Sequence, residues 1–348
     1  MEERMRVITI LFVLLLLSVA AVEAATVEGC VVPAGVTATR PDPDGVPTRI
    51  EVGVYLIDLR QLNDTEQSFE ADFVLILMWE DPRLAGFDSQ PSLAGCSVAV
   101  QEIWNPRAVI LNDRNLEGQF DSPVQIEEGG VVRYAQRYQG ELTTPLDLRD
   151  FPFDSQYLKL ELVAARFSPE EVEFVHNLEV GGRSENLTIA DWSVRKKGDV
   201  VIEPLYLAAQ KRHIPRILYR LEVSRNRGFF VIKVLIPLSL IVFMSWAVFW
   251  INPRYLPAQV GVSTSAVLTL IAFQFSLGYL LPKVSYLTRA DRFVMGSAVL
   301  VFLAFGEALL TASLADRDQS ELAHRIDARS RLVFPLVFFV VVVVSFVL

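Results

Sequence analysis

The spacing of hydrophobic and polar residues changes once along this chain, near residue 228. Before that point, apolar and polar positions alternate in short runs, which is the pattern of a strand with one buried face. In the clearest run, one face would carry Phe69, Ala71, Phe73, Leu75, Leu77 and Trp79. Further strands are expected at about 52–57, 108–111, 131–140, 157–162, 200–202 and 217–223. Because turn residues separate these runs, residues 25–227 are predicted to form an antiparallel β-sandwich.

After residue 228, four apolar stretches are each long enough to cross a bilayer. About 20 helical residues span a hydrocarbon layer of ~30 Å. We therefore expect transmembrane helices at about 229–251, 257–280, 292–314 and 332–348. The charged segment 315–331 separates the last two, and its arginines suit the inner side of a membrane. The predicted fold class is an all-β domain followed by an all-α four-helix transmembrane bundle over residues 228–348.

The second span, 257–280, is unusually polar for a helix that faces lipid, because serine, threonine and glutamine interrupt it. At steps of three or four residues, one narrow stripe consists of Gly261, Ser265, Leu268, Ala272, Phe275 and Tyr279. A helix with water on one face and protein on the others would explain this pattern, and such a helix lines a pore. A polar helix buried in a bundle would explain it equally well.

The composition agrees with a membrane protein, because 52% of the 348 residues are hydrophobic. The formal net charge is −9, with acidic residues in excess before residue 228 and basic residues in excess after it. No basic patch with interleaved aromatic residues occurs, so the sequence indicates no nucleic-acid partner. No nucleophile–base pair or cluster of metal ligands stands out, so we expect neither an enzyme nor a metal or cofactor site.

Residues 1–24 are predicted to be a secretory signal peptide, because arginines precede an apolar run and Val22-Glu23-Ala24 fits the cleavage pattern. An uncleaved anchor is the alternative. Export would place residues 25–227 and, after four spans, the C-terminus outside the membrane. On that side Cys30 and Cys96 would form a disulfide or stay as buried thiols, and the sequence leaves both open.

The most specific string in the chain is LDLRDFPFDSQ, residues 146–156, an apolar turn that needs a surface to bury it. It resembles the signature loop of the pentameric ligand-gated ion channels, the Cys-loop receptor superfamily of nicotinic, glycine and GABA receptors and their bacterial relatives. Animal members close this loop with two cysteines. The matching positions here are Thr144 and Leu158, so the chain resembles the bacterial branch.

Other motifs of this family occur in the same order along the chain. They are WEDPRL at 79–84, IWNP at 103–106, RGFF at 227–230, LIP at 235–237, PAQVG at 257–261 and LPKVSY at 281–286. The resemblance implies an immunoglobulin-like sandwich over the bundle, with five identical copies around a central pore in a lipid bilayer. It also implies a small-molecule agonist, or protons, as the opening signal and small monovalent ions as the permeant species. In a bacterium the membrane would be the plasma (inner) membrane, with the sandwich and the C-terminus in the periplasm.

The resemblance assigns roles to the second span. Leu268 falls where the family places its hydrophobic gate, Phe275 where some bacterial members narrow again, and Gly261 and Ser265 at the inner mouth. Packing between subunits is the alternative role for the two large side chains.

The inner mouth would consist of Pro257, Ala258 and Gln259. Its Pro-Ala pair resembles the anion-selective glycine and GABA receptors, and no acidic residue occurs between Ile251 and Ala290. Against anions, many bacterial members conduct cations, and an acidic outer domain would concentrate cations. The sequence favours anions, with cations as the close rival.

The agonist would bind between neighbouring sandwiches, where Trp79 of one subunit would face Trp104, Phe167 and Tyr206 of the next. Aromatic walls suit ammonium ligands by cation–π attraction. The cations around His213 would disfavour such ligands and suit an acidic ligand or protons. Both tryptophans have a second interpretation as core residues.

Gating would pass through the domain boundary. There the resemblance places the loop residues Phe151, Pro152, Phe153 and Asp154, the segment from Lys283 to Tyr286, and Arg225 with Asp154 and Glu80 as its partners. A static ion pair is the alternative. Glu307, in the third span, is expected to pair with Arg254 or Arg331.

A membrane-anchored sensor that does not conduct is the alternative function. It would need a signalling module on the inner side, and residues 315–331 are too short for one.

Overall fold

The structure, a computed structural model, describes residues 31–41, 45–86, 94–120, 122–194, 198–278 and 281–347. The predicted signal peptide 1–24, Cys30 and Tyr279 lie outside these described residues. Cys96 is disulfide-bonded, and Cys30 is the one other cysteine in the sequence.

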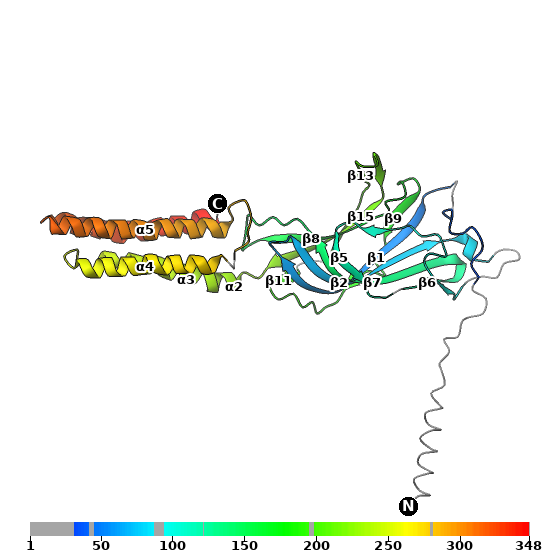
Figure 1. Cartoon of the computed structure of the whole chain (residues 1–348), viewed down its shortest axis with the longest axis horizontal. Helices are drawn as coiled ribbons and strands as arrows, with labels where there is room; N and C mark the ends of the chain where they lie inside the picture. Colours follow the sequence, from blue (N-terminus) through cyan, green and yellow to red (C-terminus); the bar gives the residue numbers. More distant parts are fainter. Residues whose placement is uncertain are drawn as a thin grey trace, which may run out of the picture.

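The N-terminal part is the predicted β-sandwich (Figure 1). Its strands are β1 Thr48–Asn63, β2 Ser68–Glu80, β3 Ser97–Val98, β4 Val109–Ile110, β5 Asp113–Gly118, β6 Val124–Ile126, β7 Val131–Thr143, β8 Ser155–Val163, β9 Val172–His176, β10 Gly182–Arg183, β11 Trp192–Val194, β12 Asp199–Ile202, β13 Leu205–Leu207, β14 Arg212–Ile214 and β15 Arg216–Arg225. Two short 3₁₀ turns, η1 Pro82–Leu84 and η2 Glu128–Gly130, lie between them.

Two sheets face each other. The first has the order β10-β1-β2-β7-β6-β3, with β5 on β7 and β9 on β1, and the second has the order β11-β15-β8-β4, with β12 on β15. All six apolar residues that the sequence placed on one face of β2 are buried in the core between the sheets. Strands β13 and β14 pair only with each other, so they form a separate hairpin.

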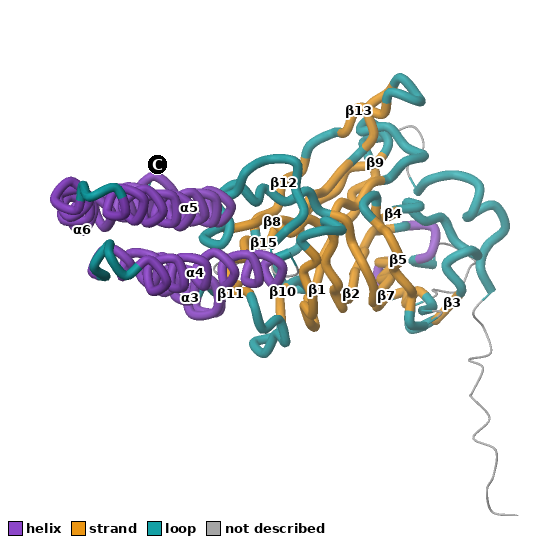
Figure 2. Tube along the Cα trace, turned by 60° about the vertical axis from the view of Figure 1, so that its left-hand side comes forward, coloured by secondary structure: helices purple, strands orange, loops and turns teal. Residues whose placement is uncertain are grey.

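The C-terminal part is a bundle of four helices long and apolar enough to span a membrane (Figure 2). The first span combines α2 Gly228–Phe230, a π-helical turn η3 Val231–Leu235, α3 Ile236–Trp246 and a 3₁₀ turn η4 Ala247–Trp250. The other spans are α4 Leu256–Leu277, α5 Arg289–Asp316 and α6 Ser320–Phe346. α5 packs against α3, α4 and α6, and the C-terminus lies at the end of the bundle next to the sandwich.

The last helix starts earlier than the apolar pattern indicates. α5 extends to Asp316 and α6 begins at Ser320, so most of the charged segment 315–331 is helical. Hydropathy marks only the part of a helix that suits lipid, whereas charged residues are good helix formers in water. An exposed ion pair between Glu321 and Arg325, one turn apart, is typical of such a helix end.

Candidate functional site

The loop between β7 and β8 inserts its apolar tip into the end of the bundle. Leu148 and Phe151 are 0% and 1% exposed and form one cluster with Phe230, Leu277 and Ala290. The rings of Phe151 and Phe230 meet edge to face with centroids 4.5 Å apart. The loop thereby buries the surface that the sequence showed to be in need of a partner.

The same loop caps the first turn of α5. A helix begins with backbone N–H groups that have no acceptor within the helix. Here the N–H of Arg289 donates to the carbonyl of Arg149 at 3.0 Å, and that of Ala290 donates to the carbonyl of Phe151 at 3.1 Å. The next N–H, of Asp291, is capped by the Thr288 side chain. The backbone of the loop is therefore bonded directly to the start of α5.

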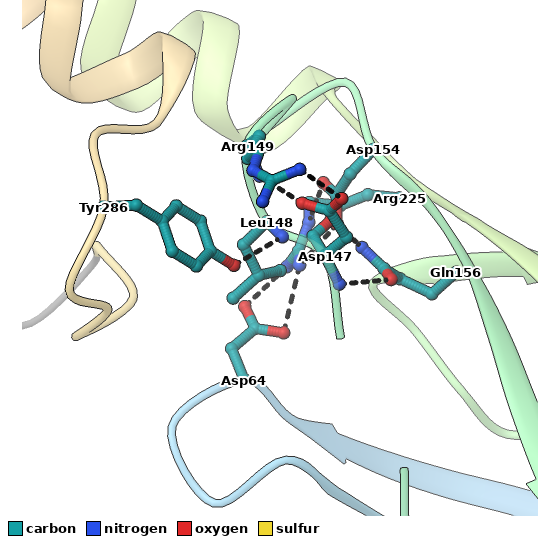
Figure 3. Close-up of polar contacts among 8 residues, drawn as sticks. All are labelled: Asp64, Asp147, Leu148, Arg149, Asp154, Gln156, Arg225 and Tyr286. Atoms are coloured by element: carbon teal, nitrogen blue, oxygen red, sulfur yellow. Dashed lines mark hydrogen bonds and ion pairs between the residues drawn. The ribbon is translucent and has the colours of Figure 1, made fainter. Parts of the chain in front are cut away.

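Side chains add further contacts across this boundary. The N–H of Leu148 donates to the hydroxyl of Tyr286 at 2.9 Å (Figure 3). Arg289 pairs with Asp150 at 2.8 Å. Phe153 meets the ring of Phe346, at the end of α6, with centroids 5.4 Å apart.

Pro152 is buried in the same loop and follows a cis peptide bond. Lys283, in the loop between α4 and α5, is exposed and forms no ion pair within the described residues.

Arg225, at the end of β15, joins the two sheets at the membrane end of the sandwich. Its Nε lies 2.8 Å from Asp154 Oδ1 and its Nη1 lies 3.0 Å from Asp64 Oδ2. The guanidinium also lies over the rings of Phe151 and Trp192, at 4.7 Å and 4.1 Å from their centroids. We call Arg225, Asp154 and Asp64 the arginine cluster (Figure 3).

The charges of this cluster are held in place by burial and hydrogen bonds. The side chains of Arg225 and Asp154 are 7% and 1% exposed. Burial alone would lower the pKa of Arg225, but the hydrogen bonds to Asp154 and Asp64 outweigh it and raise the pKa. Gln156 holds the carboxylate of Asp154 in place, because its amide nitrogen donates to Asp154 Oδ2 at 2.8 Å. The cluster is thus a buried ion-pair bridge.

Glu80, which the sequence placed beside Arg225, lies elsewhere. The turn between β1 and β2 holds Asp64 at the membrane end, and β2 runs away from it for 13 residues to Glu80. At about 3.3 Å per residue, this places Glu80 roughly 40 Å from the cluster. Asp64 takes the expected role, and only its position in a turn could have indicated it.

The polar stripe of α4 is exposed along its described length. Gly261, Ser265, Leu268, Ala272 and Phe275 all face away from the rest of the subunit, with Leu268 and Phe275 61% and 76% exposed. Gln259, Ser263, Ala266, Leu270 and Leu277 form a second stripe, buried against the subunit. The hydroxyl of Ser265 donates to the carbonyl of Gly261 at 2.8 Å, so this exposed donor has its partner within the helix.

Gln259 does not belong to the inner mouth. Its side chain is 0% exposed, and its amide nitrogen donates to the carbonyl of Ile251 at 3.2 Å within the same subunit. Pro257 and Ala258, two residues and one residue earlier, are exposed. The sequence could not separate these neighbours, because a one-residue step on a helix turns a side chain by about 100°.

The two tryptophans expected on opposite sides of an agonist pocket are core residues of one sandwich. Trp79 and Trp104 are 3% and 4% exposed, and their rings meet edge to face at 6.1 Å. The half-buried Phe167 lies 5.6 Å beyond Trp104. The alternation along β2 points Trp79 inward, which excludes it from a surface that a neighbour could reach.

Tyr206 and His213 face each other on the β13–β14 hairpin, with ring centroids 5.2 Å apart. Tyr206 is 56% exposed. The hairpin is tied to the loop that carries Phe167, because Arg212 donates to the carbonyl of Ala165 at 2.7 Å. Of the residues expected to line an agonist pocket, Tyr206 and His213 are the exposed ones.

Glu307 pairs with neither arginine that the sequence offered it. Arg331 donates to the carbonyl of Phe249 and lies over the ring of Trp250, and Arg254 donates to Ser320. Glu307 lies instead near Asp327 of α6. Within the described residues, Glu307 Oε1 and both carboxylate oxygens of Asp327 accept no hydrogen bond.

Two family models match the chain. The "Neurotransmitter-gated ion-channel ligand binding domain" matches residues 37–226, and the "Neurotransmitter-gated ion-channel transmembrane region" matches residues 234–321. The chain is 29% identical over 295 residues to the proton-gated ion channel of Gloeobacter violaceus, covering 84% of this chain and 80% of the relative. It is 26% identical over 275 residues to the gamma-aminobutyric acid receptor subunit beta-4 of Gallus gallus, covering 77% of this chain and 56% of that subunit. Residues 227–233, between the two matched regions, include the start of the first span.

Proposed function

This chain belongs to the family of neurotransmitter-gated, or pentameric ligand-gated, ion channels, and on that premise we propose that five copies form a channel whose pore is lined by α4. It is a multi-pass membrane protein, and its matched relatives are ion channels and not enzymes.

The observation that carries the pore proposal is the pair of stripes on α4. One stripe is buried in the subunit, and the other exposes small and polar residues at one end and Leu268 and Phe275 further along. A ring of five leucines would form a hydrophobic gate that excludes water when the helices lean inward.

The opening signal would reach this gate through the loop between β7 and β8. The loop contacts α2, α4 and α5 in one apolar cluster and caps α5. The arginine cluster connects the loop to both sheets. A shift of one sheet relative to the other therefore has a short route to the ends of the membrane helices.

The agonist would bind on the outer surface near the β13–β14 hairpin, where Tyr206 and His213 are available to a neighbouring subunit. Glu170 lies nearby, and its pKa is lowered chiefly by a hydrogen bond from Ser168, with a smaller contribution from the charge of His213. A relative is named a proton-gated channel, which supports protons as one candidate agonist. An acidic small molecule is the other.

Selectivity would be decided at the inner mouth, where Pro257 and Ala258 are exposed and no acidic residue lies on α4. This favours small anions, and small cations are the rival. The orientation that fits export of the sandwich places it and the C-terminus in the periplasm, on one side of the inner membrane.

Current through planar bilayers that contain the purified protein tests the proposal. We expect an opening response to acidification or to a small acidic ligand, with a reversal potential under a KCl gradient that follows the chloride equilibrium potential. A reversal potential at the potassium equilibrium would assign cations instead. A purified pentamer that passes no current under any of these conditions would contradict the channel and leave the sensor function.

A further inference from the structure

A cavity of about 430 Å³ lies between the two sheets of the sandwich. Strands β1, β2 and β7 of the first sheet and β8, β12 and β15 of the second contribute to its wall. It opens beside the segment around Leu178 and Gly182. Protein interiors are normally packed as densely as organic crystals, so a gap of this size is not ordinary core packing.

The cavity exists because small residues stand where larger ones would fill the core. Ala71 projects into it between two phenylalanines of β2, Phe69 and Phe73. Gly182 and Gly198 lie at its edge and bring no side chain. The unfilled volume gives up dispersion contacts that a larger side chain at position 71 would make.

The chemistry of the wall selects an uncharged ligand. Leu158, Leu160 and Leu221 line it, and the described wall contains no acidic residue. Lys159 and Arg220 are register partners that alternate with these leucines, so their charged ends lie on the other face of the sheet. Arg183, the third cation of the wall, is exposed.

Tyr219 supplies an aromatic face to the wall. Its hydroxyl donates to the carbonyl of Val52 at 2.9 Å, and the ring of His176 meets its edge at 5.4 Å. Burial raises the pKa of Tyr219, so the ring stays neutral. Apolar walls with one or two placed polar groups are typical of small-molecule sites of this size.

We propose that this cavity binds a small uncharged aromatic molecule, of about two fused rings, and that its occupation is coupled to the arginine cluster. Three strands of the wall lead to the cluster. β1 leads from Leu59 to Asn63, next to Asp64; Asp154 directly precedes β8, which carries Leu158; and β15 continues from Leu221 to Arg225. Asp64 lies in the turn that joins β1 and β2 of the first sheet, and its ion-pair partner Arg225 ends β15 of the second. A ligand that fixes the separation of the sheets therefore acts on the ion pair that joins them. The binding stands on the cavity alone, and its effect on gating rests on the proposed function.

The first experiment locates the ligand. Crystals of the full-length protein are soaked with 1-bromonaphthalene, and affinity is measured from the thermal stabilisation of the detergent-solubilised protein as the ligand is titrated. We expect an anomalous bromine peak between the sheets and saturable stabilisation. Ala71→Phe, which fills the cavity, should weaken binding at least tenfold, and so should Leu178→Trp at the exposed opening. Ala135→Phe, on the exposed side of β7, is the matched control and should bind as the wild type does.

Bromine peaks confined to the helices, or affinities that Ala71→Phe and Leu178→Trp leave unchanged, would overturn the site. Leu178 is 68% exposed, so its replacement tests the cavity even where Ala71→Phe does not fold.

The second experiment measures the coupling without any current. Because coupling between two sites is reciprocal, Asp64→Asn should change the affinity for 1-bromonaphthalene at least threefold, and Arg149→Ala, at an exposed ion pair of the loop between β7 and β8, should not. Equal affinities in wild type and Asp64→Asn would overturn the coupling. Absence of current in bilayers would count against the channel function only, because neither measurement here depends on it.

Discussion

Arg225 combines three properties that no other side chain supplies together. Its planar group reaches Asp154 and Asp64 at once, it keeps its charge when buried, and it lies over the rings of Phe151 and Trp192. A buried ion pair adds little stability compared with apolar residues of the same shape, whereas removal of one partner leaves a buried charge alone. The buried charges of Arg225, Asp154 and Asp64 therefore depend on one another for stability.

Replacement of Arg225 should show this dependence. Arg225→Ala is expected to lower the free energy of unfolding by roughly 3–5 kcal/mol, because Asp154 would remain buried without its cation. Arg149→Ala is the control, since Arg149 and Asp147 are 73% and 66% exposed, and it should cost about 0–1 kcal/mol. Thermal and urea unfolding of the detergent-solubilised protein measure both. Equal losses would show that Arg225 is not a buried structural charge.

Asp58 gives a prediction for acid conditions. Burial alone would raise the pKa of its carboxyl, but the backbone and hydroxyl hydrogen bonds from Thr188, each 2.8 Å long, outweigh burial and lower the pKa. The folded state then holds the proton less tightly than the unfolded state. The stability from this contact is therefore complete above the ordinary carboxyl pKa of about 4 and is lost as the pH falls through the lower folded value.

Asp58→Asn should accordingly flatten the fall in melting temperature that the wild type shows below about pH 4. Glu66→Gln, at an exposed ion pair with Arg114, is the control and should leave the curve as it is. An unchanged slope in Asp58→Asn would mean that the contact with Thr188 does not hold in solution.

At the scale of elements, α5 and α6 approach each other closely at a glycine. A Cβ placed on Gly296 would lie 2.5 Å from a methyl group of Val341. Valine has one strongly preferred rotamer in a helix, so this methyl cannot turn aside cheaply. A Cβ on Gly306, ten residues further along α5, would meet nothing within 4 Å.

The two glycines should respond with opposite signs. Gly306→Ala should raise the melting temperature, because alanine is about 1 kcal/mol better than glycine within a helix. Gly296→Ala should lower the melting temperature, since overpacking a closely packed site costs about 1–3 kcal/mol. Two increases of equal size would show that α6 is free to move away from α5.

Two carboxylates between the same two helices carry the next prediction, the half-buried Glu307 of α5 and the buried Asp327 of α6. Asp327 is 0% exposed, with neither oxygen hydrogen-bonded within the described residues, and Glu307 lies near it. Asp327→Asn should stabilise the bundle at neutral pH, because an uncharged amide costs less to bury than a carboxylate and the repulsion between the Asp327 and Glu307 carboxylates is removed. The control is Asp316→Asn, at the exposed end of α5. A lower melting temperature for Asp327→Asn would show that a partner stabilises the charge.

For the whole molecule, the sequence predicted what repeats along the chain and failed where contacts come from distant segments. Period-two patterns and apolar runs correctly indicated the sandwich and the four helices, because burial of one face or of a whole span leaves a regular trace. Asp64 was missed because it meets Arg225 only after β1 and β15 come together. Trp79 is buried and its neighbour Glu80 is exposed. How far either residue lies from the membrane depends on the direction in which β2 runs, and no local sequence pattern gives that direction.

Whether the exposed stripe of α4 meets water is a property of the assembly, and one comparison among leucines tests it. Leu268→Cys should react with a water-soluble methanethiosulfonate at least ten times faster than Leu270→Cys or Leu303→Cys. Leu270 is buried in the subunit at 0% exposure, and Leu303 of α5 is 62% exposed but belongs to an apolar surface that suits lipid. The reaction requires a thiolate, which forms in water and not in hydrocarbon, so the ratio separates a pore surface from a lipid surface at equal exposure. Equal rates at Leu268→Cys and Leu303→Cys would exclude α4 as the lining of the pore, even though its two stripes would remain.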